Sequence, residues 1–253
     1  MVFYFTGSGN SKYVAETISE DLNESCVFIP DILDGNNTFD LFEGERLGFV
    51  FPVYSWGIPE FMVDFIRKVN VTNVNYVYFV CTCGDDTGKT KEQFISLVKS
   101  RGWNVQLGYA IQMPNTYVCL PGFDVDAKDV ELDKLNNADK RLSEVIGHIK
   151  NYDKDLFDTL PGTMPWIKSA VIRPLFNKVL VTSRYFHTNN TCKKCGKCVV
   201  ECPMKNIILS PDNGHPIWQD KCVGCLRCYH ICPTNSIQFG AFTKGKGQYC
   251  YKK

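Results

Sequence analysis

The chain has 253 residues, of which 44% are hydrophobic, and its 28 Lys and Arg against 27 Asp and Glu give a formal net charge of +1. This length can supply one sizeable hydrophobic core plus a small further module, and the balanced charge excludes a general attraction to nucleic acid or to membranes. The 13 cysteines would suit a disulfide-stapled secreted protein, but no basic segment precedes the first apolar run, so we expect no signal peptide. We therefore expect a cytoplasmic chain with reduced thiols and no membrane span.

The first apolar run, residues 2–5, predicts a strand, and a helical pattern with Val14, Ile18 and Leu22 on one face follows it. Between them lies a turn of small and hydroxyl-bearing residues that can hold a phosphate: Thr6, Gly7, Ser8, Gly9, Asn10 and Ser11. In such a turn, backbone N–H groups can approach an anion that the helix dipole also favours. A dinucleotide fingerprint is not predicted, because Lys12 stands where its third glycine is needed. A tight turn without a ligand is the alternative.

Residues 26–29 and 47–51 predict two further strands. The second of these is almost wholly apolar, as expected for a strand buried on both faces of a parallel sheet. The loop that follows is a candidate binding loop with two aromatic side chains suited to cover a planar ring: Pro52, Val53, Tyr54, Ser55, Trp56 and Gly57. Alternatively, Trp56 only covers the edge of the sheet.

Residues 76–81 predict a fourth strand, and the loop after it carries further candidate binding residues: Thr82, Cys83, Gly84, Asp85 and Gly88. This loop nearly spells a Walker A motif. Cys83 takes the place of the required glycine, however, and Asp85 and Asp86 would repel a triphosphate, so nucleotide hydrolysis is not predicted. Gly84 would instead allow a close backbone approach to a bound ring, and the two carboxylates would disfavour a negative charge on that ring.

A fifth strand is predicted at residues 105–112 and a long amphipathic helix at residues 127–149. Five strands that alternate with helices predict an α/β fold with a doubly wound parallel sheet. In such sheets the ligand lies at the carboxyl ends of the strands. The three candidate loops all follow strands at that edge, so they are expected to form one site.

Residues 151–187 predict a helical linker punctuated by prolines at positions 161, 165 and 174. The chain has no acidic residue from Thr159 to Val200, whereas seven basic residues occur there: Lys168, Arg173, Lys178, Arg184, Lys193, Lys194 and Lys197. We expect a linker helix packed between two domains with a solvated basic face. A docking face for an acidic redox partner and a helix on a membrane surface remain as alternatives.

Eight cysteines form a duplicated pattern, in which Cys-x2-Cys-x2-Cys-x3-Cys-Pro occurs at residues 192–203 and again at 222–233. This is the two-cluster iron–sulfur run, in which the fourth cysteine ligates the other cluster. We therefore predict two 4Fe–4S clusters with crossed ligands. The first cysteine set is Cys192, Cys195, Cys198 and Cys232, and the second cysteine set is Cys222, Cys225, Cys228 and Cys202. Zinc is the weaker alternative, because its sites usually combine two Cys-x2-Cys pairs.

The remaining cysteines follow no pattern, and we expect them to be reduced: Cys26, Cys81, Cys83, Cys119 and Cys250. The four histidines show no ligand spacing, so structural roles are expected for them. No catalytic constellation is identified. Residues 241–253 form a short basic tail with no evident task.

These motifs together resemble the flavodoxin–ferredoxin fusions of the EFR-type ferrodoxin family, which occurs in anaerobic bacteria and archaea. The resemblance rests on YFTGSGNS, PVYSWGIPE, CTCG and MPNTY, followed by the basic linker and the double cysteine run. It implies a flavodoxin-like sheet of strand order 2-1-3-4-5 with noncovalent FMN, whose phosphate lies on residues 6–11 and whose ring lies at the other two loops. It also implies a flavodoxin-like domain at residues 1–150, the linker at 151–187, a ferredoxin-like domain at 188–240 and a tail at 241–253.

Two functions follow as expectations. In the first, the protein relays low-potential electrons between the clusters and FMN, with an acidic ferredoxin or reductase docked at the basic linker. In the second, it is an FMN-dependent reductase of a small molecule, with Tyr117 and Trp166 roofing the flavin and the clusters as the electron supply. Neither function involves nucleic acid.

Overall fold

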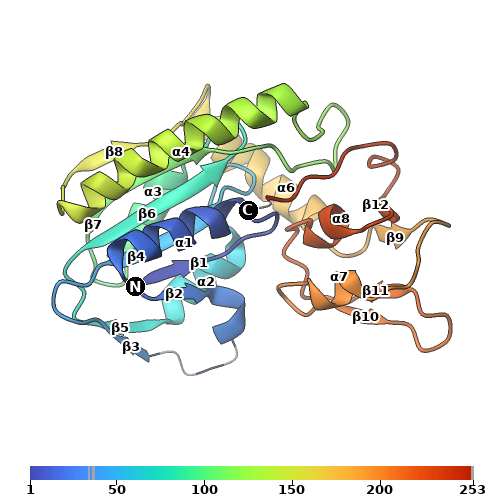
Figure 1. Ribbon diagram of the computed structural model, residues 1–253, viewed down its shortest axis with the longest axis horizontal. Coiled ribbons are helices and arrows are strands. Elements are labelled where there is room, and N and C mark those ends of the chain that lie inside the picture. The colour runs from blue at the N-terminus through green and yellow to red at the C-terminus, as the bar shows by residue number, and fades with distance from the viewer. Residues whose placement is uncertain (34, 36–37, 252–253) are drawn as a thin grey trace.

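The computed structural model describes residues 1–33, 35 and 38–251, and it shows an α/β domain beside a smaller domain that contains the duplicated cysteines (Figure 1). A six-stranded parallel sheet forms the centre of the larger domain, in the order β2-β1-β4-β6-β7-β8. Its strands are β1 (Val2–Tyr4), β2 (Cys26–Phe28), β4 (Leu47–Pro52), β6 (Val77–Cys83), β7 (Val105–Gln112) and β8 (Leu156–Asp158).

The first five of these strands have the predicted order 2-1-3-4-5, and β8 extends the sheet at the edge beside β7. Strand β8 lies in the segment expected to be a linker, because three residues followed by a proline-rich segment carry little strand signal. A second small sheet, also not predicted, pairs β3 (Thr38–Asp40) with β5 (Asn70–Thr72), and a short 3-10 helix, η1 (Ile29–Ile32), follows β2.

Helices cover both faces of the sheet (Figure 1), and the side chains of its strands alternate between the two helical layers. Phe3 and Phe5 enter the core beneath α2 (Glu60–Lys68) and α3 (Thr90–Lys99). Val2 and Tyr4 enter the core beneath α1 (Asn10–Leu22) and α4 (Lys128–Lys150). This period of two is the geometry of a strand buried on both faces.

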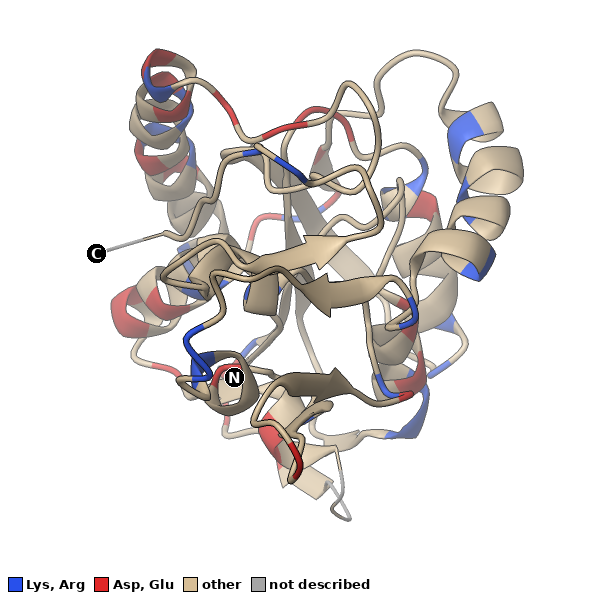
Figure 2. Ribbon diagram, turned by 90° about the vertical axis from the view of Figure 1, so that its right-hand side faces the viewer, with Lys and Arg blue, Asp and Glu red and all other residues tan. Residues whose placement is uncertain are grey.

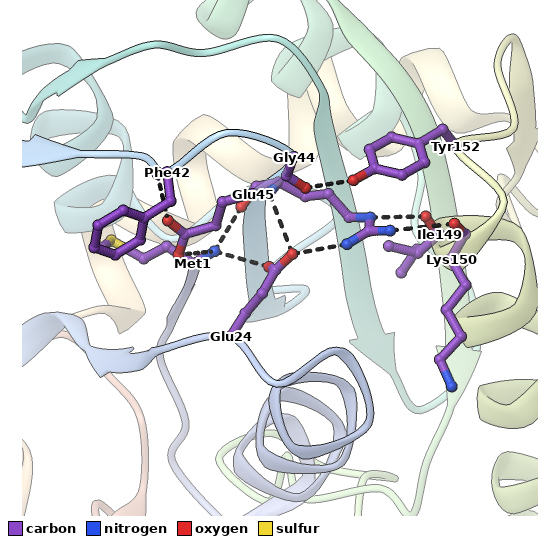
Figure 3. A network of polar contacts seen from close by, with 9 residues as sticks. Met1, Glu24, Phe42, Gly44, Glu45, Ile149, Lys150 and Tyr152 are labelled. Atoms are coloured by element: carbon purple, nitrogen blue, oxygen red, sulfur yellow. Dashed lines mark hydrogen bonds and ion pairs between the residues drawn. The ribbon is translucent and has the colours of Figure 1, made fainter.

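A polar network closes the amino end of the sheet, opposite the candidate loops (Figure 3). The Arg46 guanidinium lies 2.9 Å from Glu24 Oε1 and donates to the carbonyl oxygens of Ile149, at 2.9 Å, and Lys150, at 3.1 Å. The amino group of Met1 lies 2.8 Å from the other Glu24 oxygen. Since Ile149 and Lys150 end α4, a cation here meets carbonyls that the helix leaves unpaired.

The segment after β8 forms one helical stretch from α5 (Pro165–Ile167) through a π-helical turn, η2 (Lys168–Ile172), to α6 (Arg173–Leu180). Ser169 and Arg173 are buried, whereas Met164, Val171 and Leu175 are exposed. In Figure 2 this segment, at the right, carries blue but no red residues. Its outer face therefore presents exposed apolar side chains beside the basic ones that we expected.

The smaller domain has two antiparallel pairs, β9 (Phe186–Thr188) with β12 (Ile237–Phe239) and β10 (Ile207–Leu209) with β11 (Pro216–Trp218). Its helices are α7 (Lys197–Val200) and α8 (Arg227–Ile231), which begin at equivalent positions of the duplicated pattern. A small apolar cluster that includes Phe186, Tyr229 and Phe239 fills its centre. Among residues 1–33, 35 and 38–251, no helix is both long and apolar enough to cross a bilayer.

Candidate cofactor sites

The predicted phosphate turn lies at the amino end of α1, whose N-terminus has no side-chain cap. Ser8, Asn10 and Ser11 are buried in it. Gly9 has a left-handed φ of +102°, which favours glycine, and its N–H donates to Thr6 Oγ1 at 3.0 Å. Ser11 Oγ lies 2.8 Å from Thr82 Oγ1, so the turn and the end of β6 are joined directly.

The second candidate loop adopts left-handed φ at Ser55 (+48°) and Trp56 (+59°), and the linker helix holds it in place. Arg173 donates to the carbonyl oxygens of Tyr54 at 2.9 Å and of Ile58 at 2.5 Å. Ser169 Oγ donates to the carbonyl oxygen of Trp56 at 2.9 Å. Arg173, one of the basic residues of the linker, therefore fixes this loop and does not face solvent.

The third candidate loop also touches the linker. Lys168 forms an ion pair with Asp86, and Ser169 Oγ accepts the Lys89 N–H at 2.9 Å. The carboxylate of Asp86, expected to oppose negative charge on a bound ring, is therefore offset by a cation. Cys83 is buried, and burial raises the pKa of its thiol to about 12, with Asp85 nearby adding to the increase.

Several buried polar atoms at this edge lack a hydrogen-bond partner within the described part of the chain. They are Ser55 Oγ, Asp86 Oδ1, Thr87 Oγ1 and the Tyr117 hydroxyl. Such atoms are rare in proteins and usually indicate an absent ligand, ion or water. Two of the predicted loops contribute to this group, and Tyr117 follows β7 at the same edge. The assignment of these loops to the polar edge of a flavin ring stays a prediction with which the unpaired atoms agree, and that of residues 6–11 to its phosphate stays a prediction.

Residues 248–251 form a strap across the phosphate turn that the sequence analysis missed. The Tyr251 N–H donates to the Ser8 carbonyl oxygen at 2.8 Å, and the Tyr251 ring stacks on Tyr13. The Tyr249 hydroxyl donates to Asn10 Oδ1 at 2.8 Å. No local signal in the tail could show these contacts, since their partners lie more than 200 positions away in the chain.

The structure brings the first cysteine set together around one hollow, which also contains Lys193, Lys194 and Lys197. Burial raises the pKa of the Cys198 thiol to about 11, and the other three thiols of the set add to the increase. Burial also opposes the Cys232 thiolate, but hydrogen bonds from Ser236 and Thr234 outweigh it and lower the pKa of Cys232. Of these bonds, Ser236 Oγ to Cys232 Sγ is 3.2 Å long.

The second cysteine set is likewise gathered, in a more apolar environment. Burial raises the pKa of Cys225 to about 12, with the thiols of Cys222 and Cys202 as further causes. It also raises the pKa of Cys228 well above its usual value, and the same thiols contribute. The Trp218 indole lies at the Cys228 thiol, and its hydrogen bond opposes the rise in pKa. The buried donor Asn206 Nδ2 has no hydrogen-bond partner within the described residues, and an unpaired donor beside thiols fits the inorganic sulfur of a cluster.

Within the described ranges, no three His, Cys, Asp or Glu side chains converge closely enough to hold a single metal ion. A four-iron cluster is a larger group whose ligands lie further apart. The assignment of the two cysteine sets as cluster ligands therefore stays a prediction that this geometry accommodates.

The second cysteine set adjoins the phosphate turn. A Cβ atom added to Gly7 would lie 2.5 Å from the Cys225 carbonyl oxygen and 3.2 Å from the Tyr54 hydroxyl. Burial and the nearby thiols of Cys225 and Cys222 raise the pKa of Tyr54. Val223 and Cys225 pack against the core of the larger domain. The contact is thus built from a predicted phosphate residue, a predicted ring-covering residue and a predicted cluster ligand.

His230 joins the two domains on another side. Its Nε2–H donates to the Thr116 carbonyl oxygen at 2.8 Å, and its Nδ1 accepts the Tyr249 N–H at 3.3 Å. Burial, opposed by the bond to Thr116, lowers the pKa of His230 to about 4. A neutral imidazole with hydrogen bonds at both ring nitrogens agrees with the structural role expected for the histidines.

The chain resembles several solved structures at low similarity, including the following two. A putative flavoprotein from Bacteroides uniformis has 13% identity and a TM-score of 0.35, with 44% of this chain and 88% of that chain covered. The Trp repressor binding protein from Bacillus subtilis has 16% identity and a TM-score of 0.36, with 60% and 94% covered. The fold rests on the strand order above and not on these scores.

Comparisons with families and curated proteins cover both domains. "Pyruvate synthase subunit PorD" of Methanocaldococcus jannaschii is 40% identical over 57 residues, which are 22% of this chain and 65% of that protein, so the chain spans less than two thirds of this relative. A 4Fe-4S dicluster domain model matches residues 187–239, and a flavodoxin domain model matches residues 1–155. The chain belongs to the flavodoxin domain family, and it carries a 4Fe-4S dicluster domain after that domain, as an iron–sulfur flavoprotein of electron transfer.

Proposed function

We propose that this protein relays single electrons from a redox partner through two 4Fe–4S clusters to a noncovalently bound FMN. The first cysteine set receives the electron, the second set passes it on, and residues 6–11 with the two following loops hold the flavin. Each cluster exchanges one electron and the flavin exchanges two, so together they convert one-electron supply into two-electron storage. This order gives every predicted cofactor residue a place along one route.

The contact between Gly7 and Cys225 carries the proposal. It brings a ligand of the second set against the turn that would hold the flavin phosphate, with no side chain between them. The hollow of the first set is lined, among the described residues, by residues of the small domain between 192 and 237, and its Cys195 is exposed. The exposure of Cys195 in the first set and the contact of Cys225 in the second set with Gly7 support electron transfer from the first set through the second set to the flavin.

Replacing Gly7 by alanine tests the route. The added methyl group must displace the Cys225 carbonyl, so the second set moves away from the turn. We expect Gly7→Ala protein to keep about eight irons per chain. With FMN in excess, so that the flavin site is filled, it should transfer electrons from clusters to flavin more slowly after rapid mixing with a reductant. Gly147→Ala is the control, because nothing lies within 4 Å of a Cβ added at Gly147. Unchanged transfer in Gly7→Ala, or about four irons in the unmodified chain, would contradict the relay.

A second candidate is an FMN-dependent reductase of a small molecule. The observation that favours it is the buried, unpartnered hydroxyl of Tyr117, whose ring lies 5.3 Å from that of Phe176 in the linker helix. This pair could roof a substrate above the flavin. The Tyr117→Phe variant separates the two functions, since it would impair reduction of a small acceptor and leave transfer between clusters and flavin unchanged.

A further inference from the structure

The two halves of the small domain share a backbone contact to the sulfur of their fourth cysteines. Cys202 Sγ accepts the Asn206 N–H at 3.3 Å, and Cys232 Sγ accepts the Ser236 N–H at 3.3 Å. Donor and acceptor are four positions apart in both halves. Because this backbone contact is the same in both cysteine sets, it does not distinguish their electrostatic environments. We therefore compare the side chains around the two sets.

Hydroxyl donors occur at only one of these two sulfurs. Ser236 Oγ lies 3.2 Å and Thr234 Oγ1 lies 3.8 Å from Cys232 Sγ, a ligand of the first set. The equivalent positions beside Cys202, in the second set, hold Asn206 and Met204. A methionine cannot donate a hydrogen bond, and Asn206 Nδ2, although a donor, has no hydrogen-bond partner among the described residues. At these positions only Cys232 receives side-chain hydrogen bonds.

Positive charge is also unequal. The hollow of the first set is lined by three exposed lysines, Lys193, Lys194 and Lys197. The equivalent positions of the second half are Val223, Gly224 and Arg227. The last of these pairs with Glu201, which offsets its charge. The first set therefore lies in a more positive field.

Solvent exposure differs in the same direction. Cys195 of the first set is exposed, whereas Cys228 of the second is buried. The second set has two opposing features. The Trp218 indole N–H hydrogen-bonds to the Cys228 thiol, and Asn206 Nδ2 is a donor without a partner among the described residues. These are neutral donors, and they do not replace the three lysine charges.

We infer that the first cysteine set holds its cluster at a higher reduction potential than the second set does. Reduction adds one negative charge, which donors and cations stabilise and burial in apolar surroundings disfavours. A low-potential one-electron donor therefore leaves its first electron at the first set, away from the flavin turn. The inference rests on the proposed function, because it requires both clusters to be present.

Redox titration of the loaded protein with dithionite, followed by paramagnetic resonance, tests the inference. Two midpoint potentials are expected. The double variant Ser236→Ala/Thr234→Val should make reduction of only the higher-potential cluster about tenfold less favourable, a shift of about 59 mV for one electron. A single shared midpoint, or a shift of the lower midpoint alone, would overturn the inference.

A reciprocal variant keeps the inference testable if Ser236→Ala/Thr234→Val impairs folding or cluster binding. Met204→Thr/Asn206→Ser gives the second half the donors of the first, and it should raise only the lower midpoint. No rise in that midpoint, with both clusters intact, would count against the inference. Iron content and the number of paramagnetic centres test the proposed function separately. Fewer than two clusters per chain would contradict the proposed function itself. Two clusters of equal reduction potential would contradict the inferred difference between the potentials but would not contradict the proposed relay.

Discussion

At the scale of single residues, Arg46 shows how one buried cation fixes the end of the sheet that lies away from the cofactor loops. Its guanidinium is 11% exposed and faces Glu24, which is 5% exposed. Replacing Arg46 leaves the Met1 amino group as the remaining cationic partner of Glu24. It also removes the bonds to the Ile149 and Lys150 carbonyl oxygens, at a cost of about 2 kcal/mol. We expect Arg46→Met to lower the thermal midpoint of the loaded protein clearly, with iron and flavin content unchanged at room temperature.

Arg67 provides the matched control for this prediction. It pairs with Asp64 at 3.7 Å, and both side chains are more than half exposed. An exposed pair of this kind contributes about 0–1 kcal/mol, so Arg67→Met should leave the midpoint nearly unchanged. Equal effects of the two variants in calorimetry would show that burial of Glu24 is not what makes Arg46 important.

Single residues also show which parts of the sites could be predicted from sequence. The cysteines could be assigned to two sets because cluster chemistry requires a fixed spacing, and the duplication repeats it. Gly7 was predicted for its approach to a phosphate, but its missing side chain also admits the Cys225 carbonyl. Tyr249 and Arg173 were not assigned to the flavin site, because their partners are set by tertiary contacts that leave no local pattern.

At the scale of elements, the linker helix acts as a clamp on the second candidate loop, residues 52–57. Arg173 contributes most to the clamp, through its bonds to the Tyr54 and Ile58 carbonyl oxygens and its contact with Glu60 at 2.8 Å. We expect Arg173→Met to loosen the loop and weaken FMN binding about tenfold, equal to about 1.4 kcal/mol. Fluorescence titration of flavin-free protein measures this.

Lys178 is the control for the clamp, since it lies on the same helix but is exposed. Lys178→Met removes the same kind of charge without touching the loop, and its FMN affinity should equal that of the unmodified protein. Equal weakening in both variants would assign the effect to charge rather than to the carbonyl contacts.

The elements that were predicted correctly are those with long periodic patterns. The strands at the centre of the sheet are apolar on both faces, and α4 repeats its buried face over 23 residues. The three-residue strand β8 carries no such pattern. The π-helical turn was also missed, since Pro165 and Pro174 indicated interruptions. The structure accommodates Pro174 near the start of α6, directly after the wider turn, where its missing N–H costs least.

At the scale of the whole molecule, both cofactor regions meet at the carboxyl edge of one sheet, and the basic rim of the first set faces outward. We propose that an acidic electron donor docks on Lys193, Lys194 and Lys197. Attraction of this kind is screened over about 8 Å at physiological ionic strength. Reduction by an acidic ferredoxin should therefore slow as salt rises, and slow further when the three lysines are replaced by glutamate.

Three lysines on the larger domain, Lys99, Lys128 and Lys140, are exposed and give a control with the same change in net charge. Their replacement by glutamate should leave the rate of reduction by the acidic ferredoxin nearly unchanged. Stopped-flow mixing over a range of salt concentrations measures both variants. A rate that ignores salt and the first three lysines would place the entry of electrons elsewhere.

Because of the strap of residues 248–251, we expect FMN binding to depend on prior folding of the small domain. Besides its contacts to Ser8 and Asn10, Gln248 donates to the carbonyl oxygens of Tyr229 at 2.6 Å and Cys232 at 2.8 Å. Those carbonyls are in place only when the small domain is folded, and folding of a small metal domain is coupled to its metal. Protein stripped of iron should therefore bind FMN more weakly than iron-loaded protein in the same titration. If so, the flavin is retained only by chains whose clusters are already built, and an incomplete relay does not keep the cofactor that would store its electrons.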